Sequence, residues 1–165
     1  MVSVAVLGPS MSGKTHLCVM LAGIDHDLES VYSETCGTNY LKVDINNKPW
    51  HIWDTPAFEK TGWAAEEVAL ECDILIICYD GRHESNPCDL VDKFGAHRCI
   101  IALTRSPFAG CNLFWVFNYF RLASNPDLSL VPVVHVTDDP TPLVAAILSH
   151  PRARKEDLGG FYGRV

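Results

Sequence analysis

Short apolar runs recur along most of the chain and set its secondary-structure pattern. Two neighbouring runs, residues 38–45 and 49–53, flank an Asn-Asn pair at 46–47, and the first of them alternates apolar and polar side chains. This pattern predicts an antiparallel hairpin. Other runs are almost continuously apolar, which is typical of strands buried on both faces: residues 2–7, 74–79, 99–103 and 131–136.

The segments between these runs carry helical signals. The irregular stretch 54–62 and the polar stretch 23–37 are predicted to be loops. Strands that alternate with helices indicate an α/β domain with a mostly parallel central sheet, one antiparallel hairpin strand and helices on both faces. Helices are predicted over residues 14–21, 64–72, 86–94, 111–122 and 142–149.

Length and charge narrow the possible classes. The chain has 165 residues, of which residues 1–150 are predicted to form one domain and residues 151–165 a loosely held tail. Thirteen Lys and Arg stand against twenty Asp and Glu, a net charge of −7. A nucleic-acid binder needs a basic face, so a nucleic-acid partner is not expected.

The cysteines favour a reducing compartment, and the length of the apolar runs argues against a membrane span. Seven cysteines with no C-x-x-C spacing, several of them inside apolar runs, favour reduced and buried thiols in a cytoplasmic protein. No apolar stretch approaches the roughly 20 residues of a membrane span. The last cysteine is Cys111, so no direct membrane anchor is expected either.

Residues 8–15, GPSMSGKT, carry the strongest chemical signal. They fit the phosphate-loop pattern G-x4-G-K-[ST] between a predicted strand and a predicted helix. Glycines let the backbone wrap around phosphate oxygens, and the N–H groups of residues 10–15 then point inward at the helix start. In this interpretation Lys14 would neutralise the β and γ phosphates, and the Thr15 hydroxyl would ligate Mg²⁺. The alternative is a glycine turn that binds no phosphate.

The predicted phosphate contacts come from this loop and the residue after it. His16 either approaches the phosphates or lies on the surface. The predicted contacts are Gly8, Ser10, Met11, Ser12, Gly13, Lys14, Thr15 and His16.

Asp54, at the end of a predicted strand, gives the second signal. Beside a phosphate loop, a carboxylate that leaves a buried strand is the usual support for Mg²⁺. Taken alone, such an aspartate is more often a turn former, so this interpretation depends on the loop.

Together these segments resemble the small GTPases of the Ras superfamily, and the Rab branch most. Residues 35–40, TCGTNY, resemble the Rab sequence T-I-G-V-D-F. Residues 53–59, WDTPAFE, resemble W-D-T-A-G-Q-E, and residues 80–85, DGRHES, resemble D-x-T-x-x-E-S. The resemblance is specific over residues 1–85 and faint beyond. It implies the small-GTPase type of P-loop NTPase fold, GTP or GDP with Mg²⁺, and a molecular switch.

The resemblance also implies roles for single residues. Thr35 would sense the γ-phosphate through its backbone, and Tyr32 would cover the phosphates. Residues 28–38 and 54–68 would be the two switch segments, ordered by the γ-phosphate. The implied Mg²⁺ ligands are Thr15, Thr35 and, through water, Asp54.

Two departures concern hydrolysis. Phe58 occupies the position of the glutamine that orients the attacking water, so intrinsic GTP hydrolysis is expected to be weak or to depend on a partner. Ala57, after Pro56, replaces the glycine whose N–H meets the γ-phosphate, which stiffens that turn. Lys14 and Thr35 are the catalytic residues that the resemblance leaves in place.

A third departure concerns the base. In the place of the N-K-x-D motif stand Thr104, Arg105, Ser106 and Pro107. Thr104 and Arg105 are predicted nucleotide contacts, because the Arg105 guanidinium can stack on a base. The motif's aspartate is missing, so the choice between guanine and adenine stays open.

An aromatic surface between the switches is the predicted site for protein effectors or regulators. In Rab proteins the corresponding patch binds partners, and here it would contain Tyr40, Trp53, Trp63 and Val68. The alternative is ordinary strand packing of Tyr40 and Trp53.

Three functions follow in order of preference. The first is a divergent Rab-like guanine-nucleotide switch with weak or partner-dependent hydrolysis. The second is a pseudo-GTPase that uses a Rab-like surface to engage effectors or regulators. The third is a nucleotide kinase or ATPase, which would need arginines over the phosphates, and the acidic stretch after the loop offers none.

Overall fold

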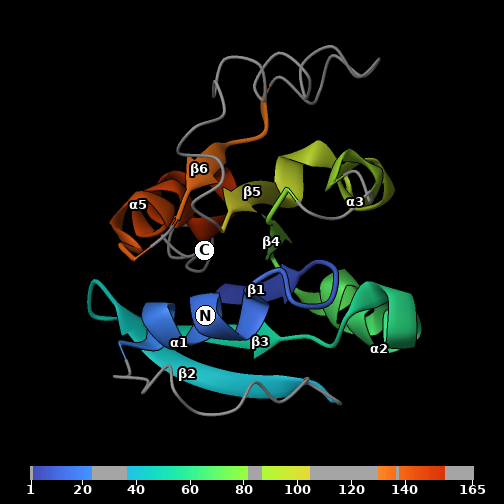
Figure 1. Ribbon diagram of the computed structural model, residues 1–165. Helices are drawn as coiled ribbons and strands as arrows, with labels where there is room; N and C mark the ends of the chain where they lie inside the picture. The colour runs from blue at the N-terminus through green and yellow to red at the C-terminus, as the bar shows by residue number, and fades with distance from the viewer. Residues whose placement is uncertain (1, 24–36, 82–86, 105–129, 137, 155–165) are drawn as a thin grey trace, which may run out of the picture.

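A computed structural model describes residues 2–23, 37–81, 87–104, 130–136 and 138–154 (Figure 1). Within these residues six strands form one sheet in the order β2-β3-β1-β4-β5-β6. The strands are β1 (Val2–Leu7), β2 (Asn39–Ile45), β3 (Lys48–Asp54), β4 (Ile74–Tyr79), β5 (Cys99–Leu103) and β6 (Val133–His135). The helices are α1 (Lys14–Ala22), α2 (Phe58–Glu71), α3 (Pro87–Phe94) and α5 (Thr141–Ser149), with short 3₁₀ turns at Ala96–Arg98 and Pro151–Arg154.

The sheet has the predicted architecture. β2 and β3 pair antiparallel, whereas the pairings of β1 with β3, β1 with β4, β4 with β5 and β5 with β6 are all parallel. Asn46 and Asn47 close the hairpin with positive φ angles of 54° and 59°. Asparagine tolerates this left-handed backbone, and two such residues form the turn that matches the twist of a hairpin.

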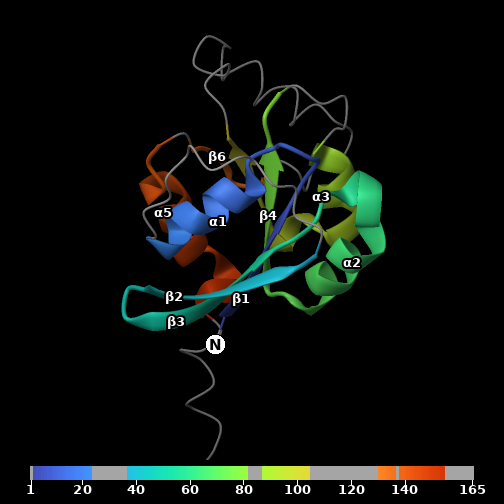
Figure 2. The same ribbon diagram turned by 60° about the horizontal axis from the view of Figure 1, so that its bottom comes forward.

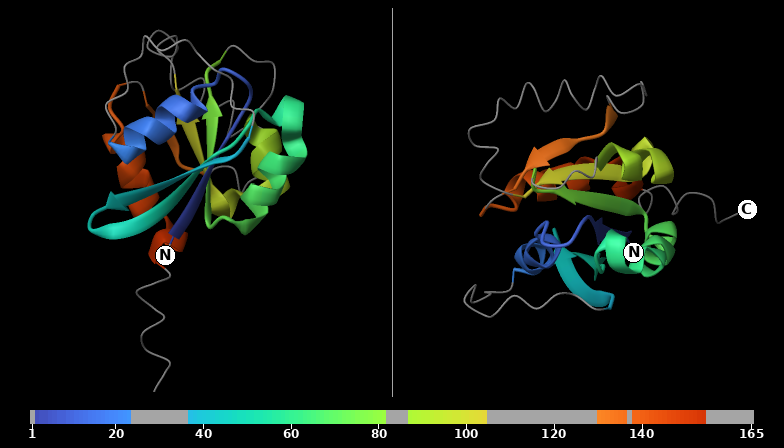
Figure 3. Two further views of the ribbon diagram at one scale, coloured as in Figure 1. Left: turned by 90° about the horizontal axis from the view of Figure 1, so that it is seen from below. Right: turned by 45° about the vertical axis from the view of Figure 1, so that its right-hand side comes forward.

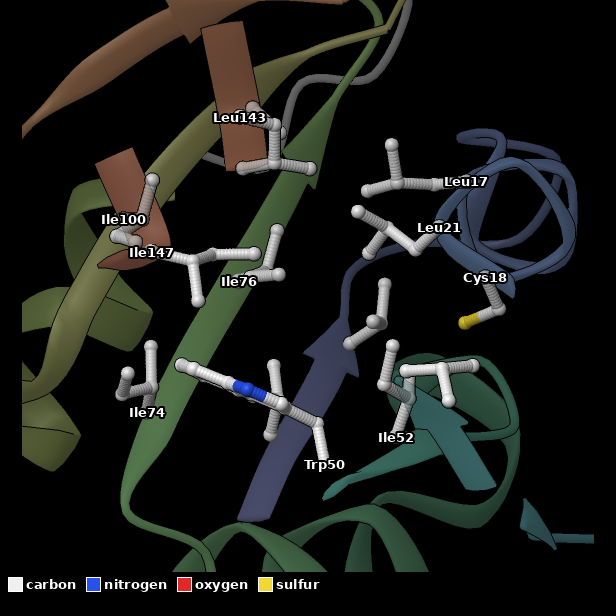
Figure 4. Packing of buried hydrophobic residues seen from close by; sticks show 14 of the residues in the cluster. Leu17, Cys18, Leu21, Trp50, Ile52, Ile74, Ile76, Ile100, Leu143 and Ile147 are labelled. Carbon is white, nitrogen blue, oxygen red and sulfur yellow. The ribbon is translucent and has the colours of Figure 1, made fainter. Parts of the chain in front are cut away.

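Helices cover both faces of the sheet, with α1 and α5 on one side and α2 and α3 on the other (Figure 3). The period-two alternation of the strands divides the core in the same way. Val4 and Ile76 face α1 and α5, whereas Leu7 and Leu75 face α2 and α3. Figure 4 shows the first of these layers, in which side chains of α1 and α5 meet those of the strands around Trp50.

The second switch segment differs from the prediction. Residues 58–62 were expected to be irregular, with a helix over 64–72, but α2 begins at Phe58 and ends at Glu71. Phe58 packs against the core next to Phe94, and Glu59 places a negative charge in the first turn, where the helix dipole favours it. These contacts extend the helix past Gly62.

The other differences lie toward the C-terminus. β6 covers Val133–His135, which is shorter than the predicted strand over 131–136. The predicted helix at 111–122 lies outside the described residues. Residues 151–154 of the predicted tail form a 3₁₀ turn, and its remainder lies outside the described residues.

The described cysteines behave as the sequence predicts. All are buried free thiols: Cys18, Cys72, Cys78, Cys88 and Cys99. Within the described ranges, every helix is too short or too polar to span a bilayer.

Candidate phosphate-binding site

The predicted site residues gather where β1, β3 and β5 end. The connection from β1 to α1 carries residues 8–13, Asp54 is the last residue of β3, and Thr104 follows β5. These strands are parallel to one another, so their carboxyl ends share one edge of the sheet (Figure 2). In open α/β sheets this edge is the usual place for a ligand.

The loop between β1 and α1 depends on its glycines. Gly8 has a φ of 146°, and a Cβ built there would lie 2.7 Å from the Cys78 carbonyl oxygen. Gly13 has a φ of 90° and directly precedes α1. Met11 also has a positive φ, of 59°. This backbone curls tightly at the start of a helix, an arrangement that points N–H groups toward an anion.

Lys14 is the first residue of α1, and its side chain turns back into the loop of residues 8–13. Its side chain is only 7% exposed, and its Nζ donates to the carbonyl oxygens of Gly8, at 3.0 Å, and Pro9, at 2.7 Å. Burial lowers the pKa of Lys14, while the nearby carboxylates of Asp54 and Glu59 oppose that shift. The loop therefore holds its ammonium against the backbone.

Thr15 and Asp54 form the second part of the site. The Thr15 hydroxyl donates to Asp54 Oδ2 at 2.7 Å, and Asp54 is 2% exposed. The next residue anchors the end of β3, because the Thr55 hydroxyl donates to the Val6 carbonyl oxygen at 2.7 Å. A hydroxyl and a carboxylate in contact are oxygen donors of the kind that Mg²⁺ prefers, so the donor set fits the predicted metal.

Thr104 braces the loop from the side of β5. Its hydroxyl donates to the backbone carbonyl oxygen of Ser12, and its Cβ lies 3.3 Å from the place where a Cβ on Gly13 would stand. The sequence indicated a nucleotide contact at Thr104 but not this link. A polar residue immediately after a buried strand was the available signal.

Phe58 and Glu59 point in different directions from the start of α2. The Phe58 ring meets the Phe94 ring edge-on, with centroids 6.2 Å apart, and Lys93 Nζ lies 5.6 Å from the Phe58 centroid. Glu59 instead reaches the loop, where its Oε1 accepts a hydrogen bond from the Ser10 N–H at 2.8 Å. The sequence alone does not indicate this contact, because it joins residues 49 positions apart.

Three predicted site residues, Tyr32, Thr35 and Arg105, lie outside the described residues. Two others are described near the loop. Ala57 is buried directly before α2, and His16 is half-buried in the first turn of α1.

The predicted effector residues occupy the hairpin and α2. Tyr40 is 39% exposed, and its ring lies 4.8 Å from that of Trp53 and 4.9 Å from that of His51. Trp63 is 73% exposed on α2, whereas Val68 is half-buried and packs with Trp53 against the same core. The structure thus brings Tyr40 and Trp53 together and leaves Trp63 in solvent.

A protein-family comparison decides the class of this site. The profile described as 50S ribosome-binding GTPase matches residues 3–105 of the chain. The chain belongs to this family. It is a phosphate-loop GTPase domain, and guanine nucleotide is the ligand of its class. The comparison with curated proteins found no match.

Several solved structures share this fold. Era from Aquifex aeolicus bound to GDP·AlF4⁻ superposes with a TM-score of 0.72 at 18% identity, over 90% of this chain and 56% of that one. Era in complex with MgGDPNP and nucleotides 1506–1542 of 16S ribosomal RNA gives a TM-score of 0.72 at 17% identity, over 90% and 56%. The GTP-bound IFT22/74/81 structure from T. brucei gives 0.65 at 19%, over 95% and 97%.

The chain thus spans about half the length of the Era chains, and at these identities the likeness concerns the fold alone. It confirms the predicted P-loop GTPase fold.

Proposed function

We propose that this GTPase is a divergent, Rab-like molecular switch that binds GDP and GTP with Mg²⁺ and hydrolyses GTP slowly without a partner. One observation carries the proposal: Lys14 is buried within the loop, next to the hydrogen bond that joins Thr15, at the start of α1, to the buried Asp54. A fold that had lost its nucleotide would have no physical reason to keep a buried ammonium beside a buried carboxylate.

The loop supplies the phosphate contacts in this proposal. The backbone N–H groups of residues 10–15 bind the phosphate oxygens, and Lys14 exchanges its carbonyl partners for the β and γ phosphates. Thr104 holds the loop in shape through Ser12. The N–H of Ala57 reaches the γ-phosphate from the start of α2.

Thr15, Thr35 and Asp54 are the proposed holders of Mg²⁺. The metal, when bound, neutralises charge on the β and γ phosphates. The protein's own part is the donor set, in which the Thr15 hydroxyl already lies 2.7 Å from Asp54.

Slow hydrolysis follows from Phe58. Its side chain carries no donor or acceptor for a water molecule, and its ring is engaged with Phe94 and Lys93 on α3. A residue that packs on the neighbouring helix cannot orient an attacking water. Rapid turnover therefore requires a group from another protein.

The proposed partners are proteins. Tyr40, Trp53, Trp63 and Val68 supply aromatic and apolar surface of the kind enriched at protein interfaces. The net charge of −7 disfavours a polyanionic nucleic-acid partner. Affinity selection with GTPγS-loaded and GDP-loaded protein, repeated with Trp63→Ala, tests this surface.

The nucleotide itself provides the main test. Purified protein is denatured and the released nucleotide is identified by chromatography, for the wild type, for Lys14→Ala and for Lys42→Ala, which removes an exposed lysine of β2 as a matched control. The proposal predicts near-stoichiometric GDP or GTP in the wild type and Lys42→Ala, and its loss in Lys14→Ala. An adenine nucleotide would contradict guanine selectivity. Protein that is empty and stays empty with added nucleotide would instead support the pseudo-GTPase that only binds partners.

A further inference from the structure

A carboxylate of the chain lies on the phosphate loop. Glu59 Oε1 accepts the Ser10 N–H at 2.8 Å, although the two residues are 49 positions apart. Ser10 belongs to the stretch of backbone N–H groups that the proposed function assigns to phosphate. One donor of the loop therefore already carries an anion supplied by the protein.

The charge on Lys14 reinforces this contact. Glu59 lies close enough to Lys14 for its carboxylate to raise the pKa of the ammonium, against the larger opposite effect of burial. Glu59 thus faces both a backbone donor and the one positive side chain of the loop. A phosphate bound near Lys14 would be repelled by the negative charge of the Glu59 carboxylate.

The first turn of α2 is held in place by the helix beside it. The Phe58 ring packs on Phe94, and Lys93 lies near the faces of both rings. About two turns farther along α2, Glu66 Oε2 pairs with Lys93 Nζ at 2.7 Å. Moving Glu59 away together with its helix would break these contacts, so its backbone stays beside the loop.

The position of Glu59 in the chain indicates which phosphate it meets. It follows Ala57, the residue that the proposed function places at the γ-phosphate, by two positions, and it contacts Ser10 of the loop. In the binding mode of the proposed function, a diphosphate would leave the Glu59–Ser10 contact intact, whereas a triphosphate would bring its last and most charged group toward that contact.

We propose that Glu59 is a specificity-determining residue that weakens the binding of nucleoside triphosphate relative to diphosphate by holding a carboxylate on the Ser10 side of the phosphate loop. This inference rests on the proposed function, because it concerns which guanine nucleotide the same site prefers. In this account the Glu59–Ser10 contact persists when a diphosphate is bound, and a triphosphate must displace it.

Calorimetric titration with GDP and with GTPγS, both in Mg²⁺, tests the inference. Glu59→Gln keeps an acceptor for the Ser10 N–H but removes the charge, and Glu59→Ala removes both. Glu67→Gln makes the same charge change at an exposed position of α2. Both Glu59 variants lack the charged Glu59–Ser10 hydrogen bond that GTPγS must displace, and both lack the negative charge that repels its γ-phosphate. The GTPγS affinity is therefore expected to rise about tenfold in both. The GDP affinity and both affinities of Glu67→Gln should stay near the wild-type values.

The outcomes separate the two proposals. If the Glu59 variants bind GDP and GTPγS in the wild-type ratio, Glu59 does not set the preference, while nucleotide binding itself stands. If wild type and variants alike bind neither nucleotide, the proposed function fails and the inference fails with it. Circular dichroism of each variant checks that the change at an exposed glutamate leaves the fold intact.

Discussion

At the scale of single residues, two glycines with positive φ serve different needs. Gly23 ends α1 with a φ of 64°, and a Cβ there would meet nothing within 4 Å. Gly8 combines its unusual φ with a carbonyl oxygen 2.7 Å from the position of a Cβ. Gly23→Ala is expected to lower the free energy of unfolding by about 1–2 kcal/mol, the strain of a left-handed residue. Gly8→Ala should lower it by roughly 3 kcal/mol or more, because strain and a clash add. Urea unfolding measures both, and equal losses would contradict the crowding at Gly8.

The Thr15–Asp54 contact makes a prediction about the metal. In the wild type, removal of Mg²⁺ with EDTA is expected to weaken GDP binding, because Thr15 and Asp54 then lose the cation between them and the phosphates. Thr15→Val keeps the shape of the side chain but lacks the hydroxyl. Its GDP affinity in Mg²⁺ is expected to fall roughly 10–100-fold and to become nearly independent of EDTA. Calorimetry with and without Mg²⁺ measures this, and an unchanged metal dependence would remove Thr15 from the site.

The sequence predicts some of these residues and misses others for a physical reason. Lys14 and Thr15 follow from a contiguous motif, and Asp54 follows from its place at the end of a buried strand. The Glu59–Ser10 and Thr104–Ser12 contacts join residues 49 and 92 positions apart. Such contacts depend on how far each element extends past the sheet edge. Residue patterns do not encode that distance.

At the scale of elements, the boundary between α2 and α3 decides what Phe58 does. Phe58→Ala is expected to lower the free energy of unfolding by about 2 kcal/mol, through lost burial and a lost aromatic pair with Phe94. GTP turnover per bound nucleotide should stay near the wild-type rate, because the ring has no group that could act on water. Single-turnover hydrolysis and thermal unfolding measure the two effects.

A matched variant on the same helix completes that test. Trp63 is also an aromatic residue of α2, but its side chain is largely exposed. Trp63→Ala should change stability by no more than about 0.5 kcal/mol. A fall in turnover without a fall in stability for Phe58→Ala would assign Phe58 a catalytic role and contradict the packing argument.

Element boundaries were predictable where the local residue pattern sets them and unpredictable where tertiary contacts set them. β1, β4 and β5 have the predicted limits because strands buried on both faces are continuously apolar. The start of α2 was missed because Gly62 interrupts its helical pattern, and the contacts of Phe58 and Glu59 override that local signal. Tertiary packing commonly outweighs propensity in this way.

At the scale of the whole molecule, buried thiols are distributed over both faces of the sheet. Cys18 and Cys78 lie on the side of α1 and α5, whereas Cys72, Cys88 and Cys99 lie on the side of α2 and α3. Burial raises the pKa of Cys72, Cys78 and Cys99 to about 12 from an ordinary value of 9.0. Both cores therefore favour the protonated thiol.

The raised pKa values of these thiols make the free energy of unfolding fall in alkali. Well below pH 9 the thiols are protonated in the folded and unfolded states, and their contribution to stability is fully present. As the pH rises from 9 toward 12, the unfolded chain releases thiol protons that the folded chain keeps, so the free energy of unfolding decreases. Lys14 acts in the opposite sense because burial lowers its pKa. Comparing the wild type with a variant that lacks one thiol, both with Lys14 unchanged, isolates the contribution of that thiol to the pH dependence.

Cys99 provides that comparison. It is fully buried in β5, its Sγ–H donates to the Gly95 carbonyl oxygen at 3.3 Å, and its pKa is about 12. Cys99→Ala is expected to lower stability at pH 7, but above pH 9 its decline should be shallower than that of the wild type by up to about 1.4 kcal/mol per pH unit. Urea unfolding at half-unit steps from pH 7 to 10.5, in a reductant, measures both slopes. Parallel slopes would mean that the Cys99 thiol titrates alike in the folded and unfolded chain, which a side chain sealed inside the core cannot do.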